Sequence, residues 1–554
     1  MIVRRDIMHI GKMTVASAIA LGLIGTVAGC GSVGSASEAA HLKLAAAPVA
    51  VPLVMAPAPY GSYTANFNPF STSSNPGTDG FVYEPLFYFS TVSSNQYGLL
   101  GRSYKWSHSG RTLTVTLRGN VKWTNGTAFS SSDVVYTFNL LKQNPALDTS
   151  GVWQKLSSVT NPNANTVVFN FKATDIPFGV YVLETYIVPK SIWSTISDPA
   201  KYENSNPVGT GPYVLSSFTS QDYTFKPNNH YYLGKPPVPE IQVPAYDTNN
   251  ALNTALADGQ LDWSGQFIPD IKGVYTSRSS NNHYYFAPYE LVGLYPNLRN
   301  SLLSLPVRKA IDVALNRTEM GAKGEYGYES PASPTGLILP AQKNYLAKGL
   351  PATATYNPKE AVAILKKAGY HEKHGTFYSP LGKPLQFTIQ VPVGWSDWDA
   401  DTAMMAQELS AIGIKTTVVQ DSYGEYVANL QGGKYTLAMS WTNVGPTPYY
   451  AFYNALDSKG DWNLEKWNSA ATNSELNAYS TTTNAASQVR AIQAVEKTLV
   501  NQLPVIPLLN GALWDEYSTQ HYTGWPTASN PYVTNAPYSW PAPEIVVMHL
   551  KPKA

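Results

Sequence analysis

The chain is predicted to form an α/β fold with more than one lobe. Residues 112–117 and 166–171 alternate in the period of a half-buried strand. Residues 131–141 combine a helix-capping signal with an apolar stripe, which predicts a helix. Behind an N-terminal leader, roughly 525 residues remain, too many for one hydrophobic core.

Further elements along the chain keep the same mixture. A helix is predicted over 358–368, because proline opens it and Gly369 ends it. A second helix is expected over 401–412, followed by a strand over 415–419. A strand is also expected over 385–391. No internal repeat or long linker is found, so the α/β class holds throughout the chain.

The only cysteine, Cys30, closes an apolar N-terminal segment that has the layout of a secretory signal. Its tetrapeptide Val-Ala-Gly-Cys resembles a bacterial lipobox, in which the cysteine is acylated and becomes the new N-terminus. We therefore expect a signal peptide over 1–29, a lipid anchor at Cys30 and a flexible tether over 30–47. The alternative is an inert cysteine in a signal peptide that is cleaved elsewhere.

Composition excludes several classes of partner. A formal charge of +1 with no cluster of Lys and Arg argues against nucleic acid. Without a second cysteine, disulfides and Cys/His zinc sites are excluded. No segment after the leader has 18 uninterrupted apolar residues, so none is predicted to span a membrane.

Enzymatic and metal-binding motifs are also missing, and we expect no catalytic residue, metal or cofactor. His371 and His374 do not have the spacing of a zinc helix. Asp397, Asp399 and Asp401 imitate the start of a calcium loop, but the required glycine is replaced by Thr402. These carboxylates are interpreted as a loop that leads into the N-terminus of the 401–412 helix.

Six separated segments together resemble the family-5 extracellular solute-binding proteins, which are dipeptide, oligopeptide and oligosaccharide receptors of ATP-binding-cassette (ABC) importers. One segment, V-G-T-G-P-Y at 208–213, matches the family's turn in every residue. Another has serine at position 131 where the family usually has alanine. The six segments are 123–138, 208–213, 228–235, 256–262, 306–317 and 356–370.

This resemblance implies a periplasmic-binding-protein type II-like clamshell, with two lobes joined by a double crossover and a subdomain inserted in the first. The implied parts are lobe 1 (48–92, 205–297 and 525–554), the inserted subdomain (93–204) and lobe 2 (298–524). It also implies a monomeric receptor without enzymatic activity. Such a receptor is exported, anchored by lipid at the extracellular face or in the periplasm, and delivers its ligand to permease subunits with their ATPases.

The ligand class is predicted from lobe 2. The family's peptide-binding branch has an aspartate shortly after a Gly-Trp pair, but here the corresponding residues 440–450 contain no acid, which counts against free-amine peptides. Tryptophans in loops suit sugar rings instead. Residues 445–449 and 524–532 also resemble cello-oligosaccharide-binding members. We therefore expect an oligosaccharide ligand, a β-glucoside in particular, with an oligopeptide as the alternative.

The candidate ligand-binding residues come from both lobes, and ordinary packing is the alternative for each aromatic one. The resemblance adds two residues near the cleft, Tyr83 and Glu84, and it gives Arg308 a structural role in a helix. The ligand-binding candidates are Trp441, Asn443, Trp395, Trp398, Trp263, Tyr83 and Glu84.

Overall fold

The computed structural model describes residues 51–93, 95–442 and 444–553, which all belong to one unit. The predicted signal peptide, the tether, Cys30 and Asn443 lie outside the described residues. Within the described part of the chain, every helix is too short or too polar to cross a bilayer.

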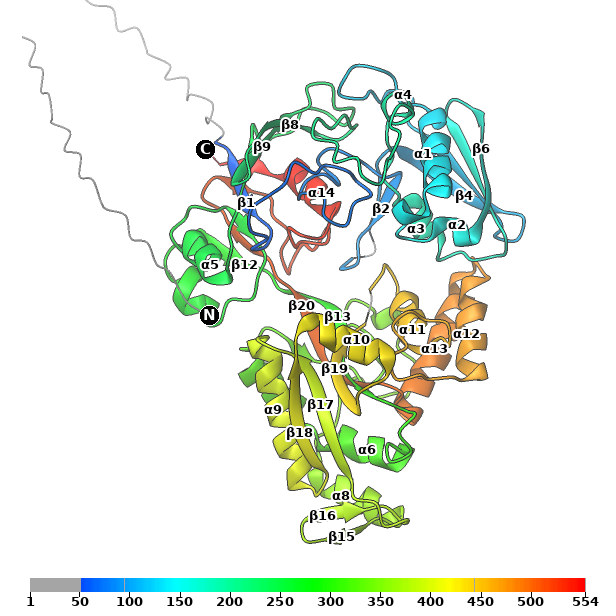
Figure 1. Ribbon diagram of the computed structural model, residues 1–554, viewed down its shortest axis with the longest axis vertical. Helices are drawn as coiled ribbons and strands as arrows, with labels where there is room; N and C mark the ends of the chain where they lie inside the picture. The colour runs from blue at the N-terminus through cyan, green and yellow to red at the C-terminus, as the bar shows by residue number, and fades with distance from the viewer. Residues whose placement is uncertain (1–50, 94, 443, 554) are drawn as a thin grey trace, which may run out of the picture. The chain divides into compact units, whose positions relative to one another are not determined.

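Three larger sheets organise the described residues, and Figure 1 shows strands from each of them. In spatial order, the seven-stranded sheet contains β12 (Asn282–Tyr284), β21 (Glu516–Ser518), β11 (Trp263–Ser264), β1 (Leu53–Ala56), β10 (Ile241–Pro244), β9 (Asp222–Pro227) and β8 (Tyr213–Phe218). The six-stranded sheet contains β14 (Ser330–Pro331), β20 (Ile506–Leu513), β13 (Ala287–Pro296), β19 (Leu437–Trp441), β17 (Gln386–Pro392) and β18 (Lys415–Asp421). The four-stranded sheet contains β4 (Gly101–Ser107), β5 (Thr112–Leu117), β7 (Thr166–Phe171) and β6 (Leu156–Asn163).

Smaller elements complete the chain. The short strand pairs are β2 (Phe87–Phe89) with β3 (Gln96–Gly98), β15 (His371–Lys373) with β16 (Thr376–Tyr378), and β22 (Tyr522–Thr523) with β23 (Lys551–Pro552). The helices are α1 (Ser131–Gln143), α2 (Val152–Lys155), α3 (Gly179–Leu183), α4 (Lys190–Trp193), α5 (Asn249–Ala257), α6 (Leu305–Ala314), α7 (Arg317–Glu319), α8 (Pro358–Lys367), α9 (Ser396–Ala411), α10 (Tyr423–Gly432), α11 (Pro448–Leu456), α12 (Ala470–Ser480), α13 (Ala485–Gln502) and α14 (Ala542–His549).

Both faces of the six-stranded sheet are covered. Leu437 and Met439 of β19 belong to a core shared with α6, α8 and α9. The residue between them, Ala438, belongs to a second core shared with α10 to α13. Because successive strand residues point to opposite faces, the continuous apolar run of β19 fills two cores at once.

The chain passes between the seven-stranded and six-stranded sheets twice, at neighbouring places. The sequence leads directly from β12 into β13, and it returns from β20 into β21. In each sheet the outgoing and returning strands pair antiparallel. Two adjacent strand connections form the double crossover that the resemblance implies. Both connections lie earlier in the chain than the lobe boundaries predicted at 297 and 524. The lobe boundaries themselves stay a prediction.

Most of the predicted elements are confirmed, and one is corrected. The strands at 112–117 and 166–171 and the helix from Pro358 have the predicted bounds to within a residue. The helix predicted at 401–412 instead begins at Ser396, so Asp397 and Asp399 lie in its first turn and not in a loop. Carboxylates stabilise that end of a helix by interacting with its dipole, which explains the earlier start.

Arg308 has the structural role expected of it. Its side chain is buried in α6 and donates hydrogen bonds to the carbonyl oxygens of Leu303, Gln502 and Leu503. The guanidinium group therefore joins α6 to the end of α13 and does not face a ligand.

Candidate functional site

A cavity of about 430 Å³ lies where β13, β19, β20 and the start of α9 meet the segment around Phe267; we call it the tryptophan cavity. The carboxyl ends of strands and the N-terminus of α9 meet at this place, where ligands of α/β sheets commonly bind. Its lining residues are Asn249, Phe267, Glu290, Val292, Glu329, Gly394, Trp395, Ser396, Asp397, Trp398, Trp441, Ala512 and Trp514.

Trp441 is the centre of a tryptophan cluster. Its ring stacks with Trp395 at 5.9 Å between centroids and with Trp462 at 5.6 Å, and it meets Trp398 at a tilt of 52°. Trp441 ends β19, Trp395 precedes the first residue of α9, and Trp398 lies within that helix. Trp395 is 36% exposed, whereas Trp398 is buried. The structure thus brings three predicted tryptophans together in one cavity wall.

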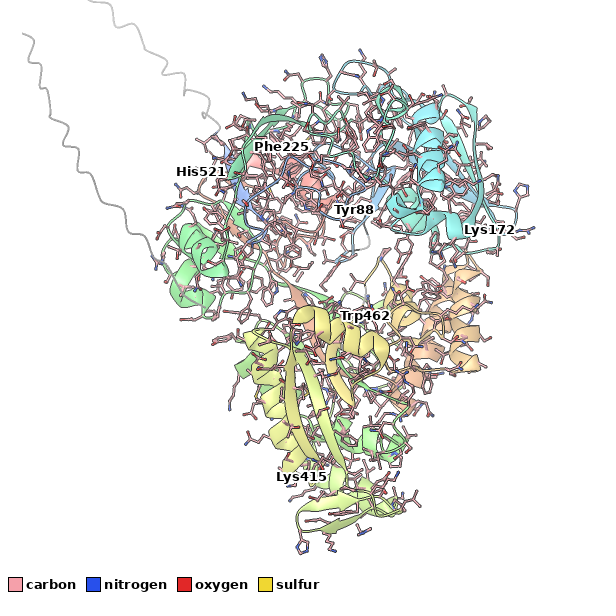
Figure 2. The ribbon with its side chains drawn as sticks, in the orientation of Figure 1. Tyr88, Lys172, Phe225, Lys415, Trp462 and His521 are labelled. Carbon is pink, nitrogen blue, oxygen red and sulfur yellow. The ribbon has the colours of Figure 1, made fainter. Side chains whose placement is uncertain are left out.

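Two tryptophans of this region are absent from the sequence-based candidates. Trp514 follows β20 and lines the opposite part of the cavity, where its ring meets Phe267 at 5.4 Å. Trp462, labelled in Figure 2, supports Trp441 from the segment after α11 and donates a hydrogen bond from Nε1 to Ser440 Oγ at 3.3 Å. Trp514 has the same signal that identifies Trp441, a tryptophan next to the end of a buried strand.

Three carboxyl groups line the same cavity, and this corrects the basis of the sequence-based ligand prediction. Residues 440–450 contain no acid, but Glu290 of β13, Glu329 and Asp397 of α9 reach the cavity from other segments. Glu329 Oε1 accepts a hydrogen bond from the backbone nitrogen of Ala512 at 2.9 Å, and Oε2 is buried without a partner among the described residues. The absence of an acid near Trp441 in the sequence therefore does not describe the folded site.

Burial changes the protonation of these acids. Desolvation raises the pKa of Glu290 to about 8, and it raises the pKa of Asp397. It also raises the pKa of Glu329 far above its usual range, with the charge of Glu290 adding to the effect. Burial also raises the pKa of Glu325 to about 11, with the charges of Glu329 and Asp401 adding to the effect, and burial raises the pKa of Asp401 to about 7. Near neutral pH the carboxyl groups of Glu290 and Glu329 are therefore mostly uncharged.

This protonation predicts a pH dependence of stability. The pKa of Glu290 is about 8 in the folded protein, against roughly 4.3 in an unfolded chain. Between these values the native state binds more protons, so the contribution of Glu290 to stability is present at acidic pH and is lost as pH rises towards 8. In Glu290→Gln, we expect the melting temperature to fall less between pH 5 and pH 8 than in the wild type. Thermal unfolding followed by circular dichroism measures both slopes, and equal slopes would contradict the prediction.

A second cavity, of about 460 Å³, adjoins the first and is rich in tyrosine; we call it the tyrosine cavity. Two links connect the cavities. Tyr289 lines the tyrosine cavity, and its neighbour in the chain, Glu290, lines the tryptophan cavity. The backbone nitrogen of Trp514, in the tryptophan cavity, donates to the hydroxyl of Tyr538, in the tyrosine cavity, at 3.0 Å. Gly445 and Pro446, from the segment that resembles sugar-binding members, also line it. Figure 2 labels Tyr88, another of its lining residues.

Tyr83 and Glu84 lie in the protein core and line neither cavity. Both side chains have no exposed surface. Tyr83 accepts a hydrogen bond from Asn204 Nδ2 at 2.8 Å, and the Tyr232 hydroxyl donates to Glu84 Oε1 at 2.6 Å. Burial raises the pKa of Glu84. We therefore leave both residues out of the proposed site.

Trp263 is likewise a packing residue in this structure, the alternative that the sequence leaves open. It lies in β11 with no exposed surface, and its Nε1 donates to Asp515 Oδ1 at 2.7 Å. Asp515 also accepts a hydrogen bond from Asn535 at 2.9 Å. The ring therefore holds a buried acid and presents no face to a ligand.

The two roles of Trp263 predict different results for Trp263→Phe. The substitution removes one donor from the buried Asp515, so we expect a loss of about 1–3 kcal/mol in the free energy of unfolding. At a temperature where the variant is folded, its affinity for the ligand should stay within about twofold of the wild-type affinity. The lost hydrogen bond lies in the core, and its removal leaves the walls of the cavity in place. Urea unfolding and calorimetric titration give the two values. A large loss of affinity with unchanged stability would return Trp263 to the ligand site.

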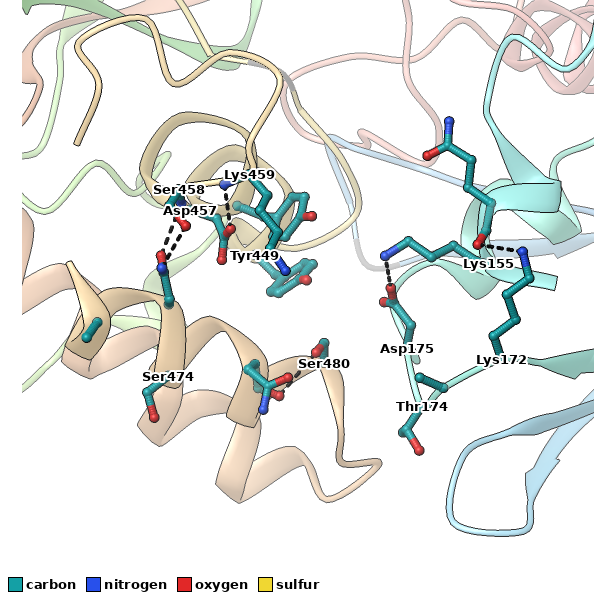
Figure 3. Close-up of a pocket in the computed structure, with 16 residues that line it drawn as sticks. Lys155, Lys172, Thr174, Asp175, Tyr449, Asp457, Ser458, Lys459, Ser474 and Ser480 are labelled. Atoms are coloured by element: carbon teal, nitrogen blue, oxygen red, sulfur yellow. Dashed lines mark hydrogen bonds and ion pairs between the residues drawn. The ribbon is translucent and has the colours of Figure 1, made fainter. Parts of the chain in front are cut away.

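Figure 3 shows a third cavity, of about 750 Å³, with a different chemistry. Lys155 points to Asp175 and forms an ion pair of 2.8 Å, while Asp457 and Lys459 lie across the cavity. Its lining mixes both signs of charge with Ser, Asn and two tyrosines. It lacks the row of indole rings found in the tryptophan cavity, so we do not take it as the ligand site.

The described residues that line the cavities form no group arranged to hold a metal. Groups of three or more His, Cys, Asp or Glu side chains placed to hold a metal are not found there. The arrangement of rings and carboxyl groups can bind and desolvate a ligand.

Comparison with known proteins finds a matching family and several relatives. The profile of the bacterial extracellular solute-binding proteins, family 5 (middle), matches residues 95–463. Protein XP55 of Streptomyces lividans is 26% identical over 322 residues, which are 57% of this chain and 57% of that protein. The oligopeptide-binding protein AppA of Bacillus subtilis is 24% identical over 422 residues, covering 71% of this chain and 75% of that protein.

Solved structures agree over most of the chain. The periplasmic oligopeptide-binding protein of a Thermotoga maritima ABC transporter has a TM-score of 0.81 and 27% identity, covering 91% of this chain and 99% of the other. A mannohexaose-bound structure of that protein has a TM-score of 0.73, again at 27% identity, with 91% and 98% covered. The fold of this chain is thus that of the type II periplasmic binding proteins.

Proposed function

Because the chain belongs to the family-5 bacterial extracellular solute-binding proteins, it is an exported receptor of an ABC importer and not an enzyme, and we propose that its ligand is an oligosaccharide. The observation that carries this proposal is the wall of indole rings formed by Trp395, Trp398 and Trp441, with Trp514 opposite. Flat aromatic faces cover the C–H faces of sugar rings. Uncharged carboxyl groups can both donate to and accept from sugar hydroxyls.

The paired cavities suit a ligand of several units. The tryptophan cavity and the adjoining tyrosine cavity have volumes of about 430 and 460 Å³, and each has the size of a small-molecule pocket. The mannohexaose-bound structure of the Thermotoga relative adds support, since that protein is named for oligopeptides and yet holds a sugar. A β-linked glucoside remains the specific ligand that we propose.

The second candidate is an oligopeptide, and two observations favour it. The Bacillus relative is named an oligopeptide-binding protein. The carboxyl groups of Glu290, Glu329 and Asp397 also offer partners for a peptide ammonium group, which the sequence near Trp441 does not.

Calorimetric titration with cellotriose, mannohexaose and a set of di- and tripeptides separates the two candidates. We expect binding of a sugar; tight binding of peptides with no heat from either sugar would overturn the oligosaccharide proposal.

The remaining parts of the proposal concern how the receptor is held and used. We propose that Cys30 is acylated, that residues 30–47 tether the receptor to the membrane, and that a monomer delivers its ligand to the permease. Two or more acyl chains anchor a protein stably, whereas one chain does so only marginally. Mass spectrometry of the mature N-terminus tests the anchor, and an unmodified N-terminus beyond Cys30 would exclude it.

A further inference from the structure

The tryptophan and tyrosine cavities share an arrangement of acidic side chains that a neutral ligand does not require. Five acids line them: Glu290, Glu329 and Asp397 in the first, and Asp79 and Glu184 in the second. None of the described residues that line either cavity is Lys, Arg or His. The chain as a whole has a formal charge of only +1, so this one-sided arrangement belongs to the site and not to the composition.

Glu329 has the position of a ligand-binding group. Its side chain is 8% exposed, it lines the tryptophan cavity, and only one of its carboxyl oxygens has a partner among the described residues. Oε2 is buried with no hydrogen bond in that part of the chain. A buried carboxyl oxygen without a hydrogen-bond partner is unfavourable, so a ligand that pairs with the Glu329 carboxyl group relieves this loss on binding.

The backbone makes room for Glu290 beside it. Glu290 pairs with Gly511 across β13 and β20. A Cβ atom at position 511 would lie 2.8 Å from Glu290 Cγ, so any larger residue would displace the carboxyl group. Within residues 51–93, 95–442 and 444–553, Glu290 makes no side-chain hydrogen bond or ion pair. Its carboxyl group is thus held in the cavity by packing and left available to a ligand.

We infer that the sugar unit bound in the tryptophan cavity carries a protonated amine, which donates hydrogen bonds to Glu290 and Glu329. This inference rests on the proposed function and narrows the ligand to an amino-sugar oligosaccharide. Carboxylates bind an ammonium group by charge-assisted hydrogen bonds, which are about twice as strong as neutral ones. The faces of indole rings attract a cation in addition, and Trp395, Trp441 and Trp514 supply them around the two acids.

An ammonium group would also change the protonation of the site. The acids that line the tryptophan cavity are Glu290, Glu329 and Asp397, and the charges of Glu325 and Asp401 interact with this group. A bound cation favours their ionised forms, so binding of an amine should release protons. A neutral sugar of the same shape lacks this effect.

The test is calorimetric titration of the full chain at pH 6 with three β-1,4-linked trimers that differ only at C2. They are the glucosamine trimer with an amine, the N-acetylglucosamine trimer with an amide, and cellotriose with a hydroxyl group. We expect the glucosamine trimer to bind at least about tenfold more tightly than cellotriose, since hydrogen bonds between charged groups have that strength. Only the glucosamine trimer should cause the protein to release protons on binding. Repeating each titration in buffers of different ionisation enthalpy measures the number of protons released.

Two variants and a control assign the effect to the cavity. In Glu290→Gln and in Glu329→Gln, the glucosamine trimer should bind no more than about threefold better than cellotriose, with little proton release. Cellotriose binding by each variant verifies that it is folded. Glu372→Gln removes an exposed acid of β15 in the same half of the chain, and it should keep the full preference for the amine.

The outcomes separate this inference from the proposed function. Equal binding of the amine and hydroxyl trimers, or a preference for the amine that both glutamine variants keep, would overturn the inference while an oligosaccharide receptor remains. Binding of peptides without binding of any trimer would overturn both.

Discussion

Trp441→Ala should lower the affinity for the sugar ligand by roughly 30-fold or more, the largest effect expected of a single substitution in the cavity. Aromatic residues at the centre of a binding site typically contribute at least about 2 kcal/mol. Trp441 also holds the rings of Trp395, Trp398 and Trp462 in place through direct contacts. Its removal therefore takes away one ring and releases its neighbours. Calorimetric titration with the best-bound trimer measures the loss.

Two further variants show whether this loss comes from the cavity. Trp153→Ala removes a half-buried indole from α2, whose Nε1 donates to the carbonyl of Phe138 at 2.6 Å, and it should leave the affinity unchanged. Trp441→Phe keeps an aromatic face at the same position and should lose less affinity than alanine. Unchanged affinity in Trp441→Ala would show that the cluster supports the fold and does not contact the ligand.

The sequence is informative about this site wherever the signal is local. Trp441 and Trp395 can be found because each lies next to the end of a strand whose apolar run is visible in the sequence. The start predicted for α9 is five residues too late, because acids that favour a helix N-terminus can lie before the helix or within its first turn, and here Asp397 and Asp399 lie within it. Local patterns thus locate the elements better than their ends.

The acids of the cavity cannot be found in the same way. Glu290 and Glu329 are far from Trp441 in the sequence. Their segments come together only because β13 pairs with β19 and β20, and because β14, which follows Glu329, also pairs with β20. An absence of acid within 440–450 is therefore a weak guide to the ligand. One signal is present, because Glu290 is the single charged residue in the ten-residue strand β13, whose C-terminal half is buried. A lone carboxyl group within such a strand marks a functional position.

Packing also explains which predicted site residues belong to the core. Trp263, Tyr83 and Glu84 lie near family motifs in the sequence, but their side chains have no exposed surface. Asp515 and Asn204 supply the polar partners of Trp263 and Tyr83. These partners lie far away in the sequence. Without the fold, a tryptophan or tyrosine that is buried with a polar partner therefore cannot be distinguished from one that contacts a ligand.

Gly209→Ala should destabilise the protein by about 3 kcal/mol or more, the largest stability effect that we expect of a single methyl group. Gly209 belongs to the V-G-T-G-P-Y turn, and a Cβ atom there would lie within van der Waals overlap of the carbonyl oxygen of Val82. Backbone atoms cannot rotate away as a side chain can. The same two segments are joined by a hydrogen bond of 2.9 Å from Gly211 N to Val82 O, so separating them would also weaken this bond.

Gly119→Ala is the matched control, because a Cβ atom there would have its nearest neighbour at 3.9 Å. Replacing such a glycine restricts the unfolded chain and should leave stability unchanged or raise it by about 0.4–1 kcal/mol. Urea unfolding followed by tryptophan fluorescence compares both variants with the wild type. If Gly209→Ala unfolded at the same urea concentration as Gly119→Ala, the turn could move away from residues 81–83 without cost. Close contact between two backbone segments would then not be the reason that this motif has a glycine at position 209.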